Sequence, residues 1–320
     1  METRNQLKSF FTDHWKYMAV SAACKLDVFD HLADQPLTST ELAAKTGYHE
    51  TNLGLLLQGL TSFDFLIRND QKFGLSELSE FLTNNHPESL KYAAMNWSGE
   101  HLTAWQQLDY TVRTGGSSFE NLFGIPYFQY LSQNPDKESD YQDAIGEYAR
   151  DDYRNLPDLV DFGIHQTLMD VGGGSGMALG FIKDTYPKTE CILFDLEGVV
   201  QKCSHPGIVR IAGDFFTEIP TIGADGILLC RVLHDWNDEK ARIILSNCLE
   251  AMKPGGILYV VENGDPDPDV NLSLLSLNMA VMCQSRERSQ ADIKSIKYFQ
   301  INYKAISPIH FRLGIGSSGF

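Results

Sequence analysis

The chain has 320 residues, of which 43% are hydrophobic and 21% are charged. This length is sufficient for two domains with good cores, and the hydrophobic content excludes general disorder. The formal net charge of −16 disfavours binding to a polyanion such as DNA. We find no run of about 18 apolar residues, which a membrane span would need. The polar residues 1–6 lack a signal-peptide core, so we expect a cytoplasmic protein.

The cysteines show no Cys-x-x-Cys pair and no clustering with histidines. Disulfide frameworks and zinc sites depend on such clustering. We therefore expect reduced and mostly buried thiols. The cysteines are Cys24, Cys191, Cys203, Cys230, Cys248 and Cys283.

Residues 38–76 predict two helices followed by a short hairpin. Thr38 is placed to cap a helix that Gly47 ends, and a second helix is expected over residues 51–60. Apolar segments on both sides of an Asn-Asp pair predict the hairpin. This is a winged-helix pattern, which is typical of DNA-binding proteins. The second helix has no Lys or Arg to contact phosphates or bases, so we expect its apolar face to pack against protein.

Residues 168–176, Leu-Met-Asp-Val-Gly-Gly-Gly-Ser-Gly, predict a strand that ends in a glycine-rich loop. Glycines let a ligand lie against the backbone, and a following helix offers unpaired N–H groups. We expect a cofactor site at Gly172, Gly173, Gly174 and Gly176. Nicotinamide, flavin and S-adenosylmethionine enzymes all use such loops, so the loop alone does not identify the cofactor.

The next two predicted strands each lead to an acidic residue. The strand at about 191–195 ends in Asp195, about 20 residues after the glycines, where a carboxylate can accept hydrogen bonds from ribose hydroxyls. The strand at 208–212 leads to Asp214 and Phe215. The acid is suited to an exocyclic amine and the ring to covering an adenine.

A fourth strand at 226–230 opens onto a polar segment that contains His234, and a Lys-Pro-Gly-Gly turn at 253–256 precedes a fifth strand at 257–262. Ligands of doubly wound sheets bind beyond the carboxyl ends of the strands. A histidine has an ordinary pKa near 6.5, so it is suited to act as a general base at neutral pH. The alternative is that His234 only caps the helix expected near Asp238.

Taken together, the glycine loop and five later segments resemble the S-adenosylmethionine-dependent O-methyltransferases. This family includes the plant phenolic enzymes, acetylserotonin O-methyltransferase and many bacterial natural-product enzymes. The N-terminal half is also similar, so the resemblance covers nearly the whole chain. The matching segments are residues 170–176, 194–196, 213–216, 233–238, 253–256 and 286–288, with 26–32, 41–43 and 113–115 in the N-terminal half.

The resemblance implies an α/β fold: a doubly wound, Rossmann-like class I methyltransferase sheet that ends in an antiparallel hairpin, preceded by an all-helical winged-helix dimerisation domain. A homodimer is expected, with the first helix, residues 7–24, crossing to the partner and contributing to its substrate pocket. The hairpin is expected near 300–307 and 309–315. The expected domains are 1–90 for dimerisation, 91–160 as a helical connector lining the substrate, and 161–320 for S-adenosylmethionine binding and catalysis.

The family pattern also implies which residues bind the cofactor, which becomes S-adenosylhomocysteine in the reaction, and no metal is expected. Cys230 stands where the family often has a lysine or a small polar residue. Asp170 is expected to orient the amino-acid end of the cofactor, and the alternative is that it only caps the next helix. The expected cofactor residues are Asp170, Gly172, Gly173, Gly174, Gly176, Asp195, Leu196, Asp214, Phe215 and Cys230.

For catalysis, the resemblance implies that His234 is the general base and that Glu262 and Glu287 orient it, although either acid could be a surface carboxylate. The family's Gly-Gly before Arg-Glu-Arg is replaced here by Gln284-Ser285, which puts the path of that loop in doubt. The residues expected to contact the acceptor are Tyr141, Ile145, Asp235, Met279 and Met282.

The expected reaction is methylation of a hydroxyl, phenolic by preference, on a small aromatic molecule. Some relatives use the bound cofactor in hydroxylation or decarboxylation instead, and that alternative stays open. A ligand-sensing winged-helix regulator would require a basic recognition face, which the sequence lacks. A nicotinamide dehydrogenase would leave the His-Asp-Trp segment unexplained.

Overall fold

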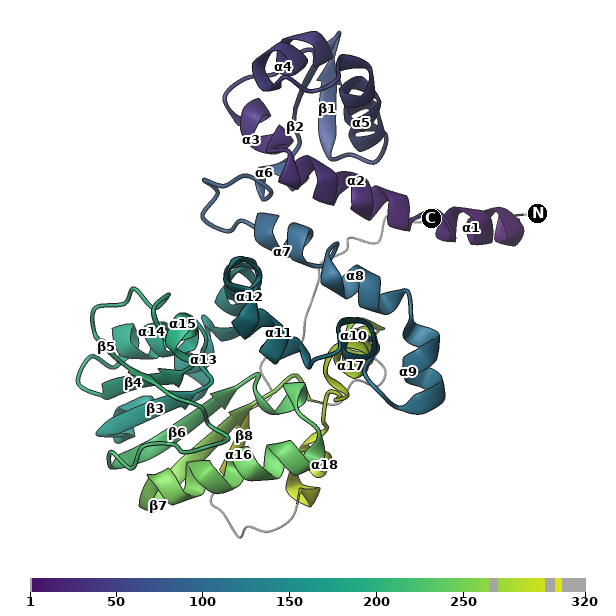
Figure 1. Cartoon of the computed structure of the whole chain (residues 1–320). Helices are drawn as coiled ribbons and strands as arrows, with labels where there is room; N and C mark the ends of the chain where they lie inside the picture. Colours follow the sequence, from purple (N-terminus) through teal and green to yellow (C-terminus); the bar gives the residue numbers. More distant parts are fainter. Residues whose placement is uncertain (1, 265–269, 297–302, 307–320) are drawn as a thin grey trace. The chain divides into compact units, whose positions relative to one another are not determined.

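The computed structural model describes residues 2–264, 270–296 and 303–306 (Figure 1). The chain divides into two compact units, one formed by residues 1–106 and 134–148 and the other by residues 107–133 and 149–320. The long helix α12 (Pro135–Tyr153) contributes to both. No helix in the described ranges is both long enough and apolar enough to cross a membrane.

The first unit is mainly helical. The predicted first helix is interrupted at residues 11–13 and forms two helices, α1 and α2. The elements are α1 (Glu2–Phe10), α2 (His14–Lys25), α3 (Val28–Ala33), α4 (Ser39–Thr46), α5 (Glu50–Ser62), β1 (Leu66–Asn69), β2 (Lys72–Leu75), α6 (Glu77–Glu80), α7 (Lys91–Asn96) and α8 (Glu100–Trp105).

The winged-helix pattern is present in this unit. Thr38 caps α4 by accepting a hydrogen bond from the Glu41 N–H at 3.1 Å, and the Glu41 carboxylate accepts one from the Thr38 N–H at 2.7 Å. Gly47 ends the helix with a φ of +77°. α5 buries one apolar face, and β1 and β2 pair as an antiparallel hairpin. The unit is therefore helical except for its wing.

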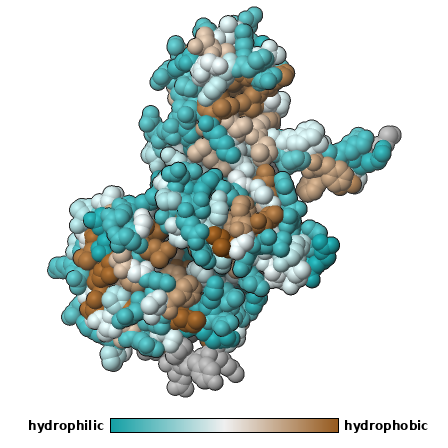
Figure 2. Space-filling model, in the orientation of Figure 1, coloured by the Kyte–Doolittle hydropathy of each residue, from teal (hydrophilic) through white to brown (hydrophobic). Residues whose placement is uncertain are grey.

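Apolar side chains are exposed on α1 and just after it (Figure 2). Single exposed apolar residues are common on protein surfaces, but a contiguous group marks an interaction surface. These four residues are called the N-terminal apolar face: Leu7, Phe10, Phe11 and Trp15, which are 53%, 71%, 63% and 65% exposed.

The second unit contains a parallel sheet with helices on both faces (Figure 1). The helices are α9 (Leu108–Thr114), α10 (Ser118–Phe123), α11 (Tyr127–Gln133), α13 (Leu156–Leu159), η1 (Phe162–Ile164), α14 (Met177–Thr185), α15 (Glu197–Val200), η2 (Leu233–Asp235), α16 (Asp238–Ala251), α17 (Val270–Cys283) and α18 (Gln290–Ser295). The strands are β3 (Thr167–Val171), β4 (Glu190–Asp195), β5 (Ile208–Ala212), β6 (Ala224–Cys230), β7 (Met252–Val261) and β8 (Tyr303–Ile306).

The strand order is β5-β4-β3-β6-β7-β8, and every neighbouring pair is parallel. All five residues of β3 are buried, as expected for a strand covered on both faces. Leu168 belongs to the apolar cluster on one face, whereas Met169 and Val171 belong to the cluster on the other. The chain order reverses between β3 and β6, which is where doubly wound sheets bind ligands.

One detail of the sheet differs from the sequence expectation, and one expected strand is present. β7 begins at Met252 rather than at residue 257, because the Lys-Pro-Gly-Gly segment is a bulge inside the strand: Ala224 pairs with Met252, but Gly226 pairs with Ile257. The predicted strand at 300–307 is present as β8, which pairs in parallel with β7. The second hairpin strand, at 309–315, lies outside the described residues.

All six cysteines are free. Cys283 is half-buried, and the other five are buried. Burial raises the pKa of the Cys24 thiol to about 12 and that of Cys191 to about 11, and it raises the pKa of the Cys248 thiol further still. The expected reduced, buried thiols are therefore observed.

Candidate active site

The glycine loop connects β3 to α14, and its shape requires glycine. Gly172, Gly174 and Gly176 have φ values of +71°, +60° and +78°, in the left-handed region that other residues rarely adopt. Gly173 is required for space, because a Cβ there would lie 2.5 Å from Oδ2 of Asp170. The loop therefore exposes bare backbone at the carboxyl end of β3.

Asp195, at the end of β4, ties that strand to the loop. Its Oδ2 accepts a hydrogen bond from the Gly174 N–H at 2.8 Å, and its Oδ1 accepts one from the Leu196 N–H at 2.7 Å. Asp214 instead bonds within its own turn, where its Oδ1 accepts from the Phe216 N–H at 2.8 Å. Phe215 lies beside the loop, since a Cβ at Gly172 would be 3.3 Å from its ring. The predicted cofactor residues on β3, β4 and the loop after β5 therefore meet at one edge of the sheet.

Asp170 is fully buried, and neither of its carboxyl oxygens has a hydrogen-bond partner among the residues described. The alternative that it caps the next helix is wrong, because Gly176 occupies that position without a side-chain bond. Burial, assisted by the nearby charge of Asp195, raises the pKa of Asp170 to about 8. Buried polar groups are normally paired, so this carboxyl group is suited to a ligand.

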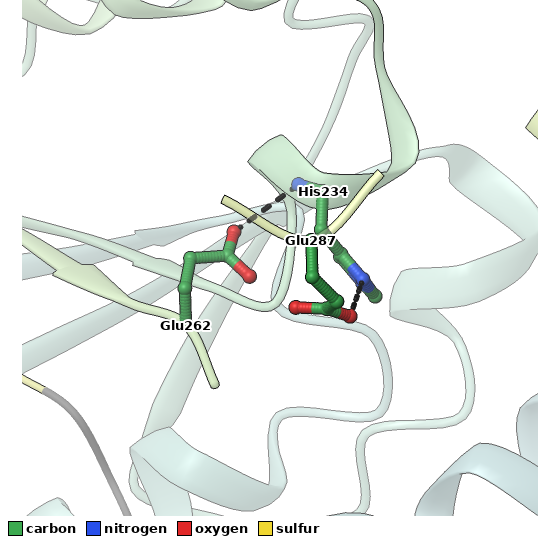
Figure 3. Close-up of side chains that lie close together, drawn as sticks. All are labelled: His234, Glu262 and Glu287. Atoms are coloured by element: carbon green, nitrogen blue, oxygen red, sulfur yellow. Dashed lines mark hydrogen bonds and ion pairs between the residues drawn. The ribbon is translucent and has the colours of Figure 1, made fainter. Parts of the chain in front are cut away.

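His234 lies on η2, just beyond the end of β6 (Figure 3). Its Nδ1 is 2.9 Å from Oε1 of Glu287. Because an ionised carboxylate can only accept, Nδ1 is the donor, and the neutral ring carries its lone pair on Nε2. Oδ1 of Asp235 is 3.5 Å from Nε2. The helix-capping alternative for His234 is wrong, since Asn237 caps α16 through a 3.0 Å bond from the Lys240 N–H.

The two predicted orienting acids act on different parts of this turn, and neither is a surface carboxylate: Glu262 is 3% exposed and Glu287 is 2% exposed. Oε1 of Glu262 accepts a hydrogen bond from the backbone N–H of Leu233 at 2.9 Å. It also accepts one from the backbone N–H of His234 at 3.2 Å (Figure 3). Glu262 therefore holds the backbone, whereas Glu287 contacts the ring. The altered loop before Glu287 still brings this residue to His234, and Ser285 anchors it through a 2.7 Å bond to the Trp236 carbonyl.

Sequence reasoning missed the roles of two arginines: Arg288, which is buried, and Arg231, whose side chain is 12% exposed. Arg231 donates to both oxygens of Glu287, at 2.7 and 2.8 Å, and to Oε2 of Glu262 at 3.1 Å. Arg288 donates to the carbonyl of Leu233 at 2.6 Å and bonds Asp238 at 2.8 Å. The sequence did contain one signal for Arg231: it is a cation that directly follows a predicted buried strand and precedes His234 by three residues.

The balance of these charges sets the protonation of the site. Burial, the largest effect, and Arg231 lower the pKa of His234, but the carboxylates of Asp235, Glu262 and Glu287 outweigh both, so the pKa is raised overall. Burial raises the pKa of Asp235 to about 6. Burial opposes ionisation of Glu287, but bonds from Arg231 and His234 hold its pKa far below its ordinary value. The site therefore contains an ionised carboxylate bonded to a titratable imidazole.

One atom from each of His234, Glu262 and Glu287 lies within 4.8 Å of the others, a spacing that a metal site would also have. Both glutamates are bonded to the guanidinium of Arg231. Arg231 therefore already supplies a positive charge to this cluster.

Three of the predicted acceptor residues, one on η2 and two on α17, lie on elements that contact each other. Met279 and Met282 are buried on α17, and Ser117 fixes the end of that helix by donating to the Met282 carbonyl at 2.9 Å. Tyr141 and Ile145 lie on the part of α12 that belongs to the first unit, so their contact with the acceptor stays a prediction.

Comparison with known proteins identifies the family. Residues 105–300 match the O-methyltransferase domain, and residues 9–85 match the O-methyltransferase dimerisation domain. The chain belongs to the S-adenosylmethionine-dependent O-methyltransferases. The enzyme thus has a Rossmann-like methyltransferase domain and a dimerisation domain. This membership overturns the dehydrogenase and winged-helix regulator alternatives.

Relatives resemble the enzyme over most of its length. It is 31% identical to phenazine O-methyltransferase of Lysobacter antibioticus over 301 residues, which cover 91% of this chain and 88% of the relative. The solved structure of human N-acetylserotonin methyltransferase in complex with S-adenosylmethionine is similar with a TM-score of 0.84 and 27% identity, covering 92% and 91% of the two chains. An O-methyltransferase from neocarzinostatin biosynthesis, solved with S-adenosylhomocysteine and 1,4-dihydroxy-2-naphthoic acid, has a TM-score of 0.77 and 27% identity, with 88% of each chain covered.

Proposed function

We propose that the enzyme methylates a phenolic hydroxyl of a small aromatic acceptor, with His234 as the general base. The observation that carries this proposal is the bond from Nδ1 of His234 to Glu287, which leaves Nε2 able to accept a proton. The aromatic, hydroxylated acceptor class is supported by a relative that is named a phenazine O-methyltransferase and by an O-methyltransferase that was solved in complex with 1,4-dihydroxy-2-naphthoic acid. The apolar side chains of Met279 and Met282 suit such a ring.

The residues of the glycine loop fit S-adenosylmethionine, which supplies an electrophilic methyl group when it is bound. The unpaired carboxyl of Asp170 suits the donor groups at the amino-acid end of this cofactor. Asp195 is proposed to accept hydrogen bonds from the ribose hydroxyls, because its carboxylate lies at the end of β4 and already binds the Gly174 N–H of the loop at 2.8 Å. Asp214, Phe215, Leu196 and Cys230 are proposed to surround the adenosine and sulfonium parts, and Leu196, which is 40% exposed, is available for contact.

In the proposed mechanism, the acceptor hydroxyl would give its proton to Nε2 of His234, and its oxygen would take the methyl group that S-adenosylmethionine supplies, with S-adenosylhomocysteine as the leaving group. Glu287 stabilises the imidazolium that forms, and Glu262 keeps the η2 backbone in place. Asp235, 3.5 Å from Nε2, adds a second carboxylate beside the proton. Because the displacement is in line, the remaining contribution of the protein is positioning. We propose that the reaction needs no metal, since Arg231 already supplies a cation that is paired with both glutamates.

The enzyme is proposed to act as a homodimer that uses the N-terminal apolar face. The matched dimerisation domain begins at residue 9, close to this face. The connector of residues 91–160 is proposed to line the acceptor site.

The proposal is tested by calorimetry with S-adenosylmethionine and by mass spectrometry of a panel of phenols and naphthols. His234→Ala and His234→Gln are expected to bind the cofactor normally and to transfer methyl groups about 10²- to 10⁴-fold more slowly. The Gln side chain can still donate to Glu287 but cannot act as the base. Wild-type turnover in the Gln variant would contradict the assigned base. A product that gains oxygen or loses carbon dioxide, rather than gaining a methyl group, would favour the non-methylating alternative.

A further inference from the structure

Arg231 has a backbone conformation that is unusual for its residue type. Its φ is +54°, in the left-handed region, where a side chain with a Cβ is strained. The backbone is held there by a 2.9 Å bond from the Arg231 N–H to the Val261 carbonyl, at the end of the neighbouring strand β7. Such strain persists only when surrounding contacts enforce it. The conformation turns the chain sharply between the last residue of β6 and the turn that carries His234.

The guanidinium of Arg231 is occupied by protein groups. It binds Glu287 through two parallel N–H···O bonds and Glu262 through a third. In the amide orientation that satisfies both residues, the oxygen of Asn263 accepts from Nη1 and Nη2 at 3.1 and 3.0 Å. The side chain is 12% exposed. Arg231 therefore acts on the two glutamates rather than on a ligand.

One oxygen of Glu287 is shared between two donors. Oε1 lies 2.7 Å from Nη2 of Arg231 and 2.9 Å from Nδ1 of His234. A bidentate arginine pair fixes the plane of a carboxylate, which a single bond does not. The direction in which Glu287 presents Oε1 to the imidazole therefore depends on Arg231.

We propose that Arg231 is a positioning residue, which fixes Glu287 against the imidazole of His234 and keeps that imidazole free to accept a proton. The proposal rests on the assignment of His234 as the base. The charges that face His234 come from four segments. Arg231 and Asp235 lie on its own segment, Glu262 follows β7, Glu287 follows α17, and Asp152 lies on α12. Arg288 also reaches this turn, but it donates to the carbonyls of Leu233 and Trp236 and pairs with Asp238, whereas Arg231 binds the glutamates that face the ring. Without Arg231 the four carboxyl groups would act on the imidazole without their paired cation, and the ring would hold its proton more tightly.

The test uses Arg231→Gln and Arg231→Lys in the full-length enzyme, with Arg242→Gln as the matched control. Arg242 is exposed on α16 and lies outside the site. The pKa of His234 is measured by NMR titration of ¹³C-labelled histidine, with His234→Ala identifying the signal. The pH dependence of methyl transfer to the phenol and naphthol panel is measured in parallel.

In Arg231→Gln, the His234 titration and the acidic limb of kcat are expected to move up by about one pH unit or more, as expected for loss of a neighbouring charge. Arg231→Lys is expected to keep the titration close to that of the wild type, because it keeps the charge. Its kcat is expected to fall about tenfold or more at every pH, because it loses the bidentate geometry. The control is expected to match the wild type. If Arg231→Gln does not fold, Arg231→Lys still tests the proposal, because it keeps the positive charge and removes the bidentate hydrogen bonds to Glu287.

An unchanged His234 titration in Arg231→Gln would overturn the proposal, as would a change confined to KM. Failure of the base assignment is distinguishable from these outcomes. If His234 titrates as expected in the Arg231 variants but His234→Gln retains full turnover, the positioning geometry stands and the proposed base does not.

Discussion

Asp170 and Gly173 form a matched pair at the carboxyl end of β3: a Cβ at position 173 would lie 2.5 Å from the Asp170 carboxyl oxygen. The buried acid thus limits its neighbour to glycine, and the glycine loop lies directly against the acid. This relationship connects the shape of the loop with its chemistry, and two predictions depend on it.

Gly173→Ala is expected to weaken S-adenosylmethionine binding at least tenfold, because the new methyl group also meets Leu193 at 2.6 Å and must displace the loop. Binding is measured by titration calorimetry. Gly180→Ala is the control, since its Cβ meets only His205 at 3.7 Å and lies within α14. That variant is expected to bind normally and to gain about 0.5–1 kcal/mol of stability. Wild-type affinity in Gly173→Ala would show that the loop can move without penalty.

Asp170 is expected to make the stability of the free enzyme depend on pH. Its pKa is about 8 in the folded chain, and the ordinary value is 3.8. The folded state therefore binds the proton more tightly, and the contribution is full below pH 3.8 and is lost as the pH rises through about 8. The free energy of unfolding is measured with urea between pH 5 and 9. The value for the wild type minus the value for Asp170→Asn should fall as the pH rises. A constant difference would contradict the assignment.

Glu287→Gln is expected to lower the free energy of unfolding by about 3 kcal/mol at pH 7, because it leaves the charge of Arg231 buried and less well paired. The pKa of Glu287 is depressed, so its stabilisation is present above its ordinary value of 4.5 and is lost as the pH falls. The difference in the free energy of unfolding between the wild type and Glu287→Gln should therefore become smaller at acidic pH. Denaturant unfolding at pH 7 and pH 4 measures it, and the exposed Glu218→Gln serves as the control.

Replacing Phe10 and Phe11 by serine is expected to weaken self-association, because these rings are 71% and 63% exposed in the single chain. Sedimentation at several concentrations measures the dissociation constant, which should rise about tenfold or more for two lost aromatic anchors. Val112→Ser, at another exposed apolar position, is the control. Unchanged association in the double variant would exclude the N-terminal apolar face as the dimer interface.

Much of the fold could be predicted because its signals are local. The strand β5 and the capped helix α4 follow from short runs of apolar residues and from capping residues. The glycine loop also identifies the cofactor edge of the sheet. The bulge in β7 could not be predicted, because a Lys-Pro-Gly-Gly segment reads as a turn until its pairing with β6 is known.

The candidate site was only partly predictable for a related reason. His234, Glu262 and Glu287 could be selected from the family pattern, but the bond between Arg231 and Glu287 joins residues separated by 56 positions. Its existence depends on the left-handed turn at Arg231 and on burial, neither of which has a local signature in an arginine. The orphaned carboxyl of Asp170 is likewise a property of the packed structure.

Each unit contains a buried cysteine whose reaction with an alkylating reagent can report how often the core of that unit opens. Only the thiolate reacts with alkylating reagents, and burial raises the pKa of Cys24 in the first unit and of Cys191 in the second. Modification of either residue must therefore wait for the surrounding helices or strands to separate. The rate at which each thiol is alkylated thus reports the opening of the dimerisation and methyltransferase domains independently of each other.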